Sequence, residues 1–127
     1  MPEIVFLSLE LVLELHRRSL REHGGSDGIR DQAGLESAVA QPQHDHYYGG
    51  ADVFGVAAAY AFHIAEAQAF VDGNKRTGIG SALLCLELAG IDTAVPSPDA
   101  LYDAMVAIAT HQLDKPGLAA LFRRLFA

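Results

Sequence analysis

Polar and hydrophobic residues alternate along most of this chain with the period of an α-helix. From Ser8, a residue type that caps helix N-termini, the positions of one face recur three and four residues apart. These positions are Leu9, Val12, Leu13, His16 and Leu20. Two successive glycines, Gly24 and Gly25, then interrupt the pattern, and glycine favours the backbone conformation that ends helices. The pattern therefore predicts a first helix between Ser8 and Gly24.

A second and shorter helix is expected after Asp31, whose side chain is suited to capping it. We expect this helix to cover residues 32–40 and to end near Pro42, because proline lacks the N–H that a helix interior needs. Residues 43–50 are mostly polar and show no periodicity. The sequence predicts that they form the longest loop of the chain.

Four further helices follow from the same reasoning, and strand signals are weak. The helices are expected from Asp52 to about Gln68, from about Asn74 to residues 87–89, from Ser97-Pro98-Asp99 to about His111, and from Pro116 onward. The segments 4–6 and 93–95 are too short to build a sheet. We therefore expect an all-α, single-domain bundle of about six helices spanning residues 1–127.

Charge and composition narrow the classes of partner. The chain carries 9 Lys and Arg against 16 Asp and Glu, a formal charge of −7, which argues against broad nucleic-acid binding. A single cysteine, Cys85, excludes an internal disulfide and is expected to be a small buried hydrophobic residue. The first residues lack the basic start of a signal peptide, and no stretch is long enough to span a bilayer. We expect a cytoplasmic protein with no membrane partner.

The segment Phe70-Val71-Asp72-Gly73-Asn74-Lys75-Arg76-Thr77, between two hydrophobic helices, differs from the rest of the chain. A helix that begins after a glycine leaves backbone N–H groups free to bind an anion. Lys75 and Arg76 add two cations, and Asp72 could hold a divalent metal that bridges phosphate oxygens. The alternative is an interhelical turn followed by a solvated first turn. Cations at a helix N-terminus oppose the helix dipole, and a bound anion would remove that conflict, which favours a phosphate site.

The residues Gln68-Ala69-Phe70-Val71-Asp72-Gly73-Asn74-Lys75-Arg76-Thr77 resemble the signature loop of the Fic/Doc family, H-x-F-x-[DE]-[GA]-N-[GK]-R. Segments 24–31 and 35–38, with Pro42, also resemble the N-terminal part of that family, so the resemblance covers essentially the whole chain. The chain looks closest to the Doc (death-on-curing) branch, the toxins of type II toxin–antitoxin modules. The resemblance implies the Fic/Doc fold.

The resemblance also implies roles for individual residues. Asp72 would be the Mg²⁺ ligand, Gly73 and Asn74 would bind phosphate, Lys75 and Arg76 would engage the phosphates of ATP, and Phe70 would pack the loop into the core. The predicted loop at residues 43–50 lies where the family has its target-docking flap. That position assigns target docking to His46, Tyr47 and Tyr48.

The resemblance implies a reaction as well. Fic proteins that transfer AMP carry a second arginine three positions after the first, and this chain has Ile79 there. Its absence resembles the Doc branch, which uses ATP to phosphorylate a threonine of elongation factor Tu. AMP transfer of the Fic type is kept as an alternative. Self-inhibited members carry an [ST]-x-x-x-E-[GN] motif that is missing here, so control would come from an antitoxin protein in trans.

One departure from the family pattern concerns catalysis. The family's general base is a histidine, and the corresponding residue here is Gln68. Glutamine can orient a hydroxyl but does not accept a proton near neutral pH, and loss of a positioned base costs about 10²–10⁴-fold in rate. Natural drift, a selected or introduced inactivating change, and a substitute base are three open explanations. His63 is five residues earlier, about 140° away around the helix, which favours a packing role.

Other residues admit two interpretations each. His44, Asp45 and His46 offer two metal ligands at best, so a surface role is favoured over a metal site. Tyr47 and Tyr48 either dock a partner or pack against the domain, with packing slightly favoured. Three arginines of the first helix, Arg17, Arg18 and Arg21, form either a solvated face or a dock for an acidic antitoxin segment.

Three functional hypotheses follow. The first is a Doc-like toxin that transfers phosphate from ATP to a protein hydroxyl and is impaired by Gln68. The second is a non-catalytic module of the same fold that binds nucleotide or antitoxin. The third is a plain helical interaction domain in which the segment 70–77 is only a turn.

Overall fold

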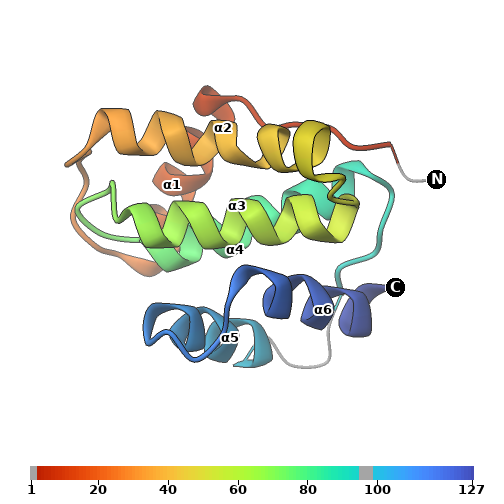
Figure 1. Ribbon diagram of the computed structural model, residues 1–127. Helices are drawn as coiled ribbons and strands as arrows, with labels where there is room; N and C mark the ends of the chain where they lie inside the picture. The colour runs from red at the N-terminus through yellow and green to blue at the C-terminus, as the bar shows by residue number, and fades with distance from the viewer. Residues whose placement is uncertain (1–2, 95–98) are drawn as a thin grey trace.

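The computed structural model describes residues 3–94 and 99–127, and Figure 1 shows their arrangement. The helices are α1 (Leu9–His23), α2 (Gln32–Gly49), α3 (Val53–Ala67), α4 (Asn74–Leu88), α5 (Asp99–Ala109) and α6 (Lys115–Phe126). The described residues form no strand beyond an isolated bridge between Ile29 and Phe70. The prediction of an all-α, single-domain bundle of six helices is confirmed.

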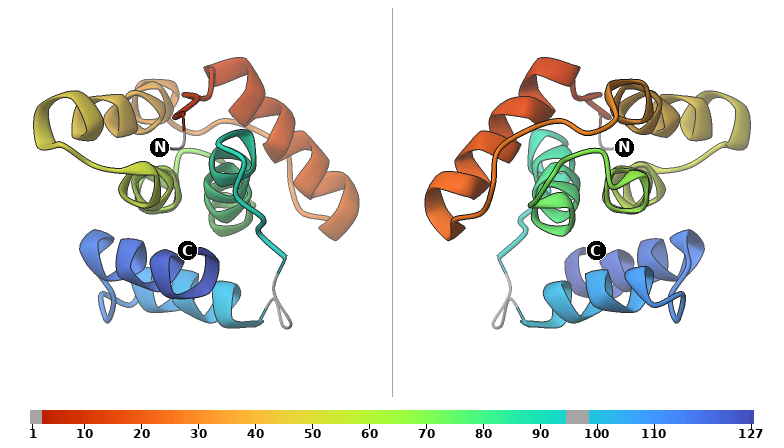
Figure 2. Two further views of the ribbon diagram at one scale, coloured as in Figure 1. Left: turned by 90° about the vertical axis from the view of Figure 1, so that its right-hand side faces the viewer. Right: turned by 90° about the vertical axis from the view of Figure 1, so that its left-hand side faces the viewer.

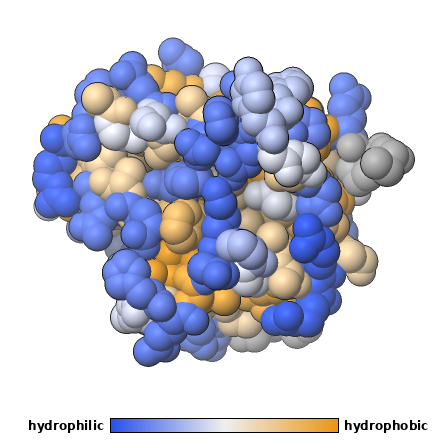
Figure 3. Space-filling model, viewed as in Figure 1, coloured by the Kyte–Doolittle hydropathy of each residue, from blue (hydrophilic) through white to orange (hydrophobic). Residues whose placement is uncertain are grey.

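The helices form three layers, with α3 and α4 in the middle. In Figure 2, where α3 and α4 are seen nearly end-on, α1 and α2 lie on one side of this central pair and α5 and α6 on the other. Helix α3 contacts α2, α4, α5 and α6. It is rich in alanine and buried on most of its surface, so neighbouring helices can approach it closely. Figure 3 shows a mostly hydrophilic face, with a hydrophobic area at the level between α3 and the α5–α6 pair.

The contact between α3 and α4 positions the segment that follows α3. A Cβ added to Gly78 of α4 would lie 2.8 Å from the backbone carbonyl oxygen of Ala61 in α3. Glycine is therefore needed at position 78 for the two backbones to approach this closely. Cys85, further along α4, is fully buried as expected, and burial raises the pKa of its thiol to about 11. The tight contact fixes the loop that joins α3 to α4.

Most of the expected helix boundaries are confirmed. Ser8 caps α1 by accepting a hydrogen bond from the N–H of Leu11 at 3.1 Å, and Gly24 follows its last residue. Asp31 and Asp52 cap α2 and α3 through the N–H groups of Gly34 and Gly55. The sixth helix begins at Lys115, one residue earlier than expected. The expected start of the fifth helix at Ser97-Pro98 lies outside the described residues.

The predicted end of the second helix at Pro42 is wrong. Helix α2 continues through Pro42 to Gly49, so residues 43–49 are helical and the expected long loop does not exist. The second half of the helix is held by Asp45, which accepts hydrogen bonds from Gln41 at 3.0 Å and from Lys115 of α6 at 2.6 Å. These contacts, together with burial of the proline ring, offset the one backbone hydrogen bond that Pro42 cannot form.

Candidate phosphate-binding site

The candidate site is built around the loop between α3 and α4. Gln68 ends α3 in the left-handed conformation, with φ 47° and ψ 40°, and its N–H donates to the carbonyl of Ala65 at 3.3 Å. This conformation is uncommon for a residue other than glycine, and here it turns the chain out of the helix. The side chain of Gln68 is exposed to solvent.

A second segment pairs with this loop along its backbone. The N–H of Arg30 donates to the carbonyl of Ala69 at 2.6 Å, and the N–H of Val71 donates to the carbonyl of Gly28 at 3.0 Å. The guanidinium of Arg30 also donates to the carbonyl of Gln68 at 3.1 Å. Sequence reasoning missed this pairing, although the unusual glycine content of residues 24–28 was a signal that the segment is not helical.

Two side chains hold the loop from inside. Phe70 is fully buried, as the resemblance implied. The Oδ1 of Asn74 accepts from the N–H of Phe70 at 3.1 Å, and its Nδ2 donates to the carbonyl of Phe70 at 3.0 Å. The amide of Asn74 is therefore occupied by the loop's own backbone. The prediction that Asn74 binds phosphate is untested. Since both polar atoms of its side chain are engaged, the backbone N–H of Asn74 is the group that would bind the phosphate.

The carboxylate of Asp72 lies on the surface of the loop. Its Oδ1 accepts from the N–H of Gly73 at 2.9 Å, and its Oδ2 lies 3.4 Å from the N–H of Ser26. The described residues contain no group of three or more acidic, histidine or cysteine side chains that could hold a metal ion. A single exposed carboxylate still suits Mg²⁺, which usually takes one or two protein carboxylates and completes its shell with water and phosphate oxygens.

Helix α4 begins next to this carboxylate without a side-chain cap. Gly73 is its N-cap residue, with φ 82°, and the first backbone hydrogen bond runs from Thr77 to Gly73. The N–H groups of Asn74, Lys75 and Arg76 therefore have no partner inside the helix. Lys75 and Arg76 are exposed, and within residues 3–94 and 99–127 neither forms an ion pair.

Two surface hollows meet at Asn74 and Lys75. One has a volume of about 150 Å³ and is lined by Ala65, Glu66, Gln68, Asn74, Lys75 and Ala109. The other, of about 210 Å³, is lined by residues 71–76 and Tyr102 of α5. The structure thus brings together the expected residues Gln68, Asp72, Gly73, Asn74, Lys75 and Arg76. Sequence reasoning missed Glu66 and Tyr102, because helical spacing alone does not show which exposed residues face a hollow.

The three residues assigned to a flap lie elsewhere. His46, Tyr47 and Tyr48 belong to the C-terminal end of α2, whereas the loop at Gln68–Gly73 packs near the N-terminal end of that helix (Figure 1). An α-helix of 18 residues is about 27 Å long, so the structure does not bring these residues to the loop. Their role in target docking stays an untested prediction.

The expected packing of the two tyrosines is wrong. Tyr47 is 67% exposed and Tyr48 is 83% exposed. Tyr47 contacts the ring of Phe6, and Tyr48 contacts the exposed ring of His44, so each touches a neighbour without being covered. His46 is held by a hydrogen bond between its Nδ1 and the carbonyl of Ala51 at 2.7 Å. These residues form an aromatic surface at the end of α2.

His63 takes part in a polar cluster away from the loop. Its Nε2 lies 3.0 Å from the Nζ of Lys115, which also donates to Asp45 at 2.6 Å. Burial and the adjacent positive charge of Lys115 lower the pKa of His63, while Asp45 opposes them. Its Nε2 accepts from Lys115, so the imidazole is held in a contact between helices, which favours the packing role.

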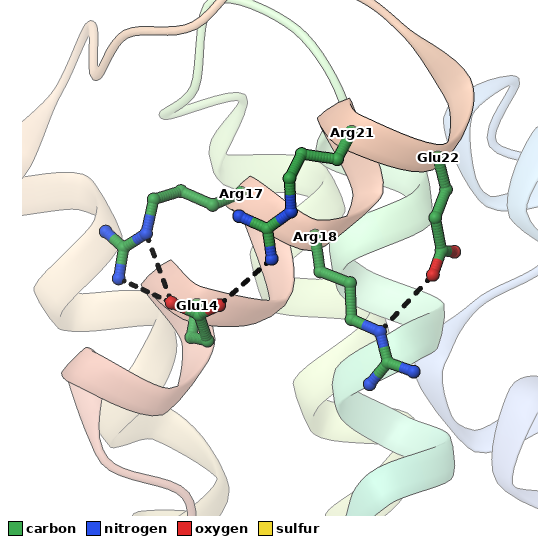
Figure 4. A network of polar contacts seen from close by, with 5 residues as sticks. All are labelled: Glu14, Arg17, Arg18, Arg21 and Glu22. Carbon is green, nitrogen blue, oxygen red and sulfur yellow. Dashed lines mark hydrogen bonds and ion pairs between the residues drawn. The ribbon is translucent and has the colours of Figure 1, made fainter.

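The arginines of α1 are paired with acidic residues of the same helix, as Figure 4 shows. Arg17 and Arg21 both donate to Glu14, at 2.9 and 3.2 Å, and Arg18 donates to Glu22 at 3.3 Å. The hydrogen bonds from Arg17 and Arg21 lower the pKa of the Glu14 carboxyl. The arrangement favours a solvated face that neutralises its own charge.

Among the described helices, none combines the length and the hydrophobic character needed to cross a bilayer.

The chain matches a family model and is similar to named proteins. A family model described as the Fic/DOC family matches residues 6–86. A protein kinase doc of Escherichia phage P1 is 33% identical over 121 residues, covering 94% of each chain. A toxin Doc of Mycolicibacterium smegmatis is 36% identical over 102 residues, covering 76% of this chain and 77% of that one. The match to the family model includes the loop between α3 and α4, and the similarity to the phage protein covers nearly the whole chain.

Proposed function

Since this chain belongs to the Fic/DOC family, we propose that it is a Doc-like toxin that transfers phosphate from ATP to a threonine or serine hydroxyl of a protein. The observation that carries the proposal is the pair of unpaired cations, Lys75 and Arg76, at an uncapped helix start next to the exposed Asp72 carboxylate. Similarity to a protein named as a kinase favours phosphate transfer over AMP transfer. A translation factor such as elongation factor Tu is the target class.

The N-terminus of α4 provides the phosphate contacts. The N–H groups of residues 74–76 point out of the helix start, where the positive end of the helix dipole attracts an anion. Lys75 and Arg76 add direct charge–phosphate contacts, and arginine can bind two phosphate oxygens at once. The triphosphate would pair with these two cations, which form no ion pair among the described residues.

Asp72 would hold Mg²⁺. The ion would supply charge neutralisation across the phosphate oxygens during transfer. Asp72 is already oriented by the N–H of Gly73 at 2.9 Å, so little rearrangement of the carboxylate is needed.

Gln68 governs the approach of the acceptor hydroxyl. It lines the same hollow as Lys75, and its amide can accept a hydrogen bond from a hydroxyl and so orient it. It does not remove the proton, so transfer would be about 10²–10⁴-fold slower than with a positioned base. Glu66 is a carboxylate lining the same hollow, and a Glu66→Gln variant shows whether any residual transfer uses it.

The proposal includes a partner and a place of action. Relatives named as Doc toxins support an antitoxin that binds in trans. Because the proposed reaction uses ATP and a translation factor, we expect it to take place in the cytoplasm. Neither nucleic acid nor a membrane takes part directly. A second candidate is a non-catalytic nucleotide- or antitoxin-binding module of the same fold, which Gln68 specifically favours.

Calorimetric titration with ATP and Mg²⁺ tests the phosphate site. We expect the unaltered chain to bind and Arg76→Ala to bind at least about 10-fold more weakly, the loss typical of a charged contact. Arg124→Ala is the matched control, since Arg124 is an exposed arginine of α6 with no ion pair in the described part of the chain. Absence of binding by the unaltered chain would exclude the phosphate site and leave an antitoxin-binding module or the plain interaction domain.

Restoring the histidine tests catalysis. Expression of Gln68→His should arrest bacterial growth and phosphorylate a cytoplasmic protein, whereas the double variant Gln68→His/Arg76→Ala should do neither. Co-expression of the antitoxin should relieve the arrest. A silent Gln68→His variant that still binds ATP would favour the non-catalytic binding module.

A further inference from the structure

His16 is a residue of α1 whose side chain reaches the inner side of the candidate site. It lies on the buried face of the helix and is only 2% exposed. Its imidazole stacks on the ring of Phe70, with centroids 3.7 Å apart and an angle of 9° between the planes. The ring is therefore parallel to, and in direct contact with, the side chain that anchors the loop.

The same imidazole forms a hydrogen bond to the loop backbone. Its Nε2 lies 2.8 Å from the carbonyl oxygen of Asp72. A carbonyl oxygen only accepts hydrogen bonds, so Nε2 carries the hydrogen and donates it. One side chain from α1 thus contacts both Phe70 and Asp72.

We propose that His16 is a positioning residue that fixes the Asp72–Gly73 peptide and thereby aims the Asp72 carboxylate and the start of α4 at the phosphates. This inference rests on the function proposed above. His16 acts through Asp72 and Gly73 and touches no substrate itself.

The planarity of the peptide bond links the two sides of the loop. In a trans peptide the C=O and the following N–H point in opposite directions. Because His16 holds the Asp72 carbonyl toward the core, the N–H of Gly73 points away from His16. It donates there to the Asp72 Oδ1 at 2.9 Å. The hydrogen bond of His16 inside the protein therefore determines where the carboxylate lies on the surface.

The conformation of Gly73 depends on the same contact. Gly73 adopts φ 82° and ψ 16°, and a Cβ built on it would lie 3.4 Å from the Cδ2 of His16. The imidazole thus packs against the N-cap of α4. Rotation of the Asp72–Gly73 peptide would break the hydrogen bond to His16 and redirect the first N–H groups of the helix.

If His16 only filled space in the core, its Nε2 would not be needed. The ring volume and the stack on Phe70 could be supplied by phenylalanine, which carries no polar atom that requires a partner in the core. The hydrogen bond to Asp72 is what a histidine adds. Two substitutions therefore separate the contributions, because His16→Phe keeps the ring and His16→Gln keeps an N–H donor on a side chain of similar reach.

Nucleotide affinity and stability are measured together on the full chain. We expect His16→Phe to weaken Mg²⁺-dependent ATP binding by about 10-fold, the scale of one lost positioning contact. We expect His16→Gln to stay within about threefold of the unaltered chain. The matched control is Tyr60→Phe, which removes a buried 2.7 Å hydrogen bond to the N–H of Leu7 and is expected to leave the affinity unchanged. Thermal melting shows whether His16→Phe is destabilised more than Tyr60→Phe.

A readout in the free protein separates this inference from the proposed function. In His16→Phe the backbone amide resonances of Gly73 and Ser26 should shift, and in Tyr60→Phe they should not. If the unaltered chain binds no ATP, the proposed function fails, and these resonances still decide whether His16 positions the loop. Unchanged resonances, or a folded His16→Phe variant that binds ATP like the unaltered chain, would overturn the inference. If His16→Phe does not fold, a loss of more than about 10-fold in His16→Gln overturns it.

Discussion

Asn74 shows how one side chain can organise a loop that others use for binding. Its amide donates to and accepts from the backbone of Phe70, so both polar atoms are engaged at 3.0–3.1 Å. The signature motif places an asparagine here, and the resemblance to the family implied that Asn74 binds phosphate. In the structure the Asn74 side chain binds the loop backbone instead. Lys75, Arg76 and the first N–H groups of α4 are then the groups that can bind an anion.

We expect Asn74→Ala to lower the free energy of unfolding by about 1–3 kcal/mol, because it leaves the N–H and C=O of Phe70 without partners in a partly buried place. Chemical denaturation gives this value directly. The control is Lys75→Ala at the next position, where the side chain is exposed and unpaired and the change should stay within about 0.5 kcal/mol. Equal effects of the two variants would contradict the bracing role of Asn74.

At the scale of elements, the approach of α4 to α3 depends on a missing side chain. A Cβ at position 78 would meet a backbone carbonyl of α3 at 2.8 Å, and a backbone atom cannot rotate away. Gly80, two residues later in the same helix, has no atom within 4 Å of such a Cβ. The two glycines therefore form a natural pair for comparison.

We predict opposite effects for alanine at these two positions. Gly78→Ala should destabilise the protein by about 1–3 kcal/mol, since the two helices must separate to admit the methyl group. Gly80→Ala should stabilise it by about 0.5–1 kcal/mol, since alanine loses less backbone entropy in a helix. Thermal or urea unfolding measures both, and a stabilised Gly78→Ala would show that the contact is looser than described.

Helix boundaries were predictable where the signal is local. Ser8, Asp31 and Asp52 cap helices through side-chain contacts to residues three positions ahead, so sequence alone identified them. The continuation of α2 through Pro42 was not predictable, because it depends on Lys115, which is 70 positions beyond Asp45 in the chain. The same holds for the candidate site. The local motif identified residues 68–76, but the contact of His16 with Asp72 joins residues 56 positions apart and was not predictable.

At the scale of the whole molecule, one polar cluster fastens α6 to the other layers. Lys115 of α6 donates to Asp45 of α2 and to His63 of α3, so three helices meet at one ammonium group. Burial pushes the pKa of Asp45 upward, but hydrogen bonds from Lys115 and Gln41 outweigh it and hold the pKa below its usual value. The cluster therefore depends on an ionised aspartate and a neutral histidine.

The lowered pKa of His63 makes stability depend on pH. As pH falls below about 6.5, the unfolded chain takes up a proton at this residue before the folded protein does, so the free energy of unfolding decreases. We expect the decrease to begin near pH 6.5 and to continue down to the folded-state pKa of His63. Asp45 contributes a separate loss only at lower pH, below its usual value of 3.8.

Unfolding curves at a series of pH values check this expectation. In His63→Gln the decline between about pH 6.5 and 5 should be shallower, because glutamine can accept from Lys115 without titrating. His44→Gln, which removes an exposed imidazole of α2, should keep the original slope. A slope unchanged in His63→Gln would show that the decline comes from other groups.

The position of the loop at one end of the bundle has a practical consequence for attaching the protein to a surface. In Figure 1 the C-terminal end of α6 lies on the opposite side of the molecule from the turn between α3 and α4. A biotinylated linker added after Ala127 would therefore leave the turn facing the flowing solution. Association and dissociation rates for nucleotides and for candidate antitoxins can then be recorded on one oriented layer of molecules.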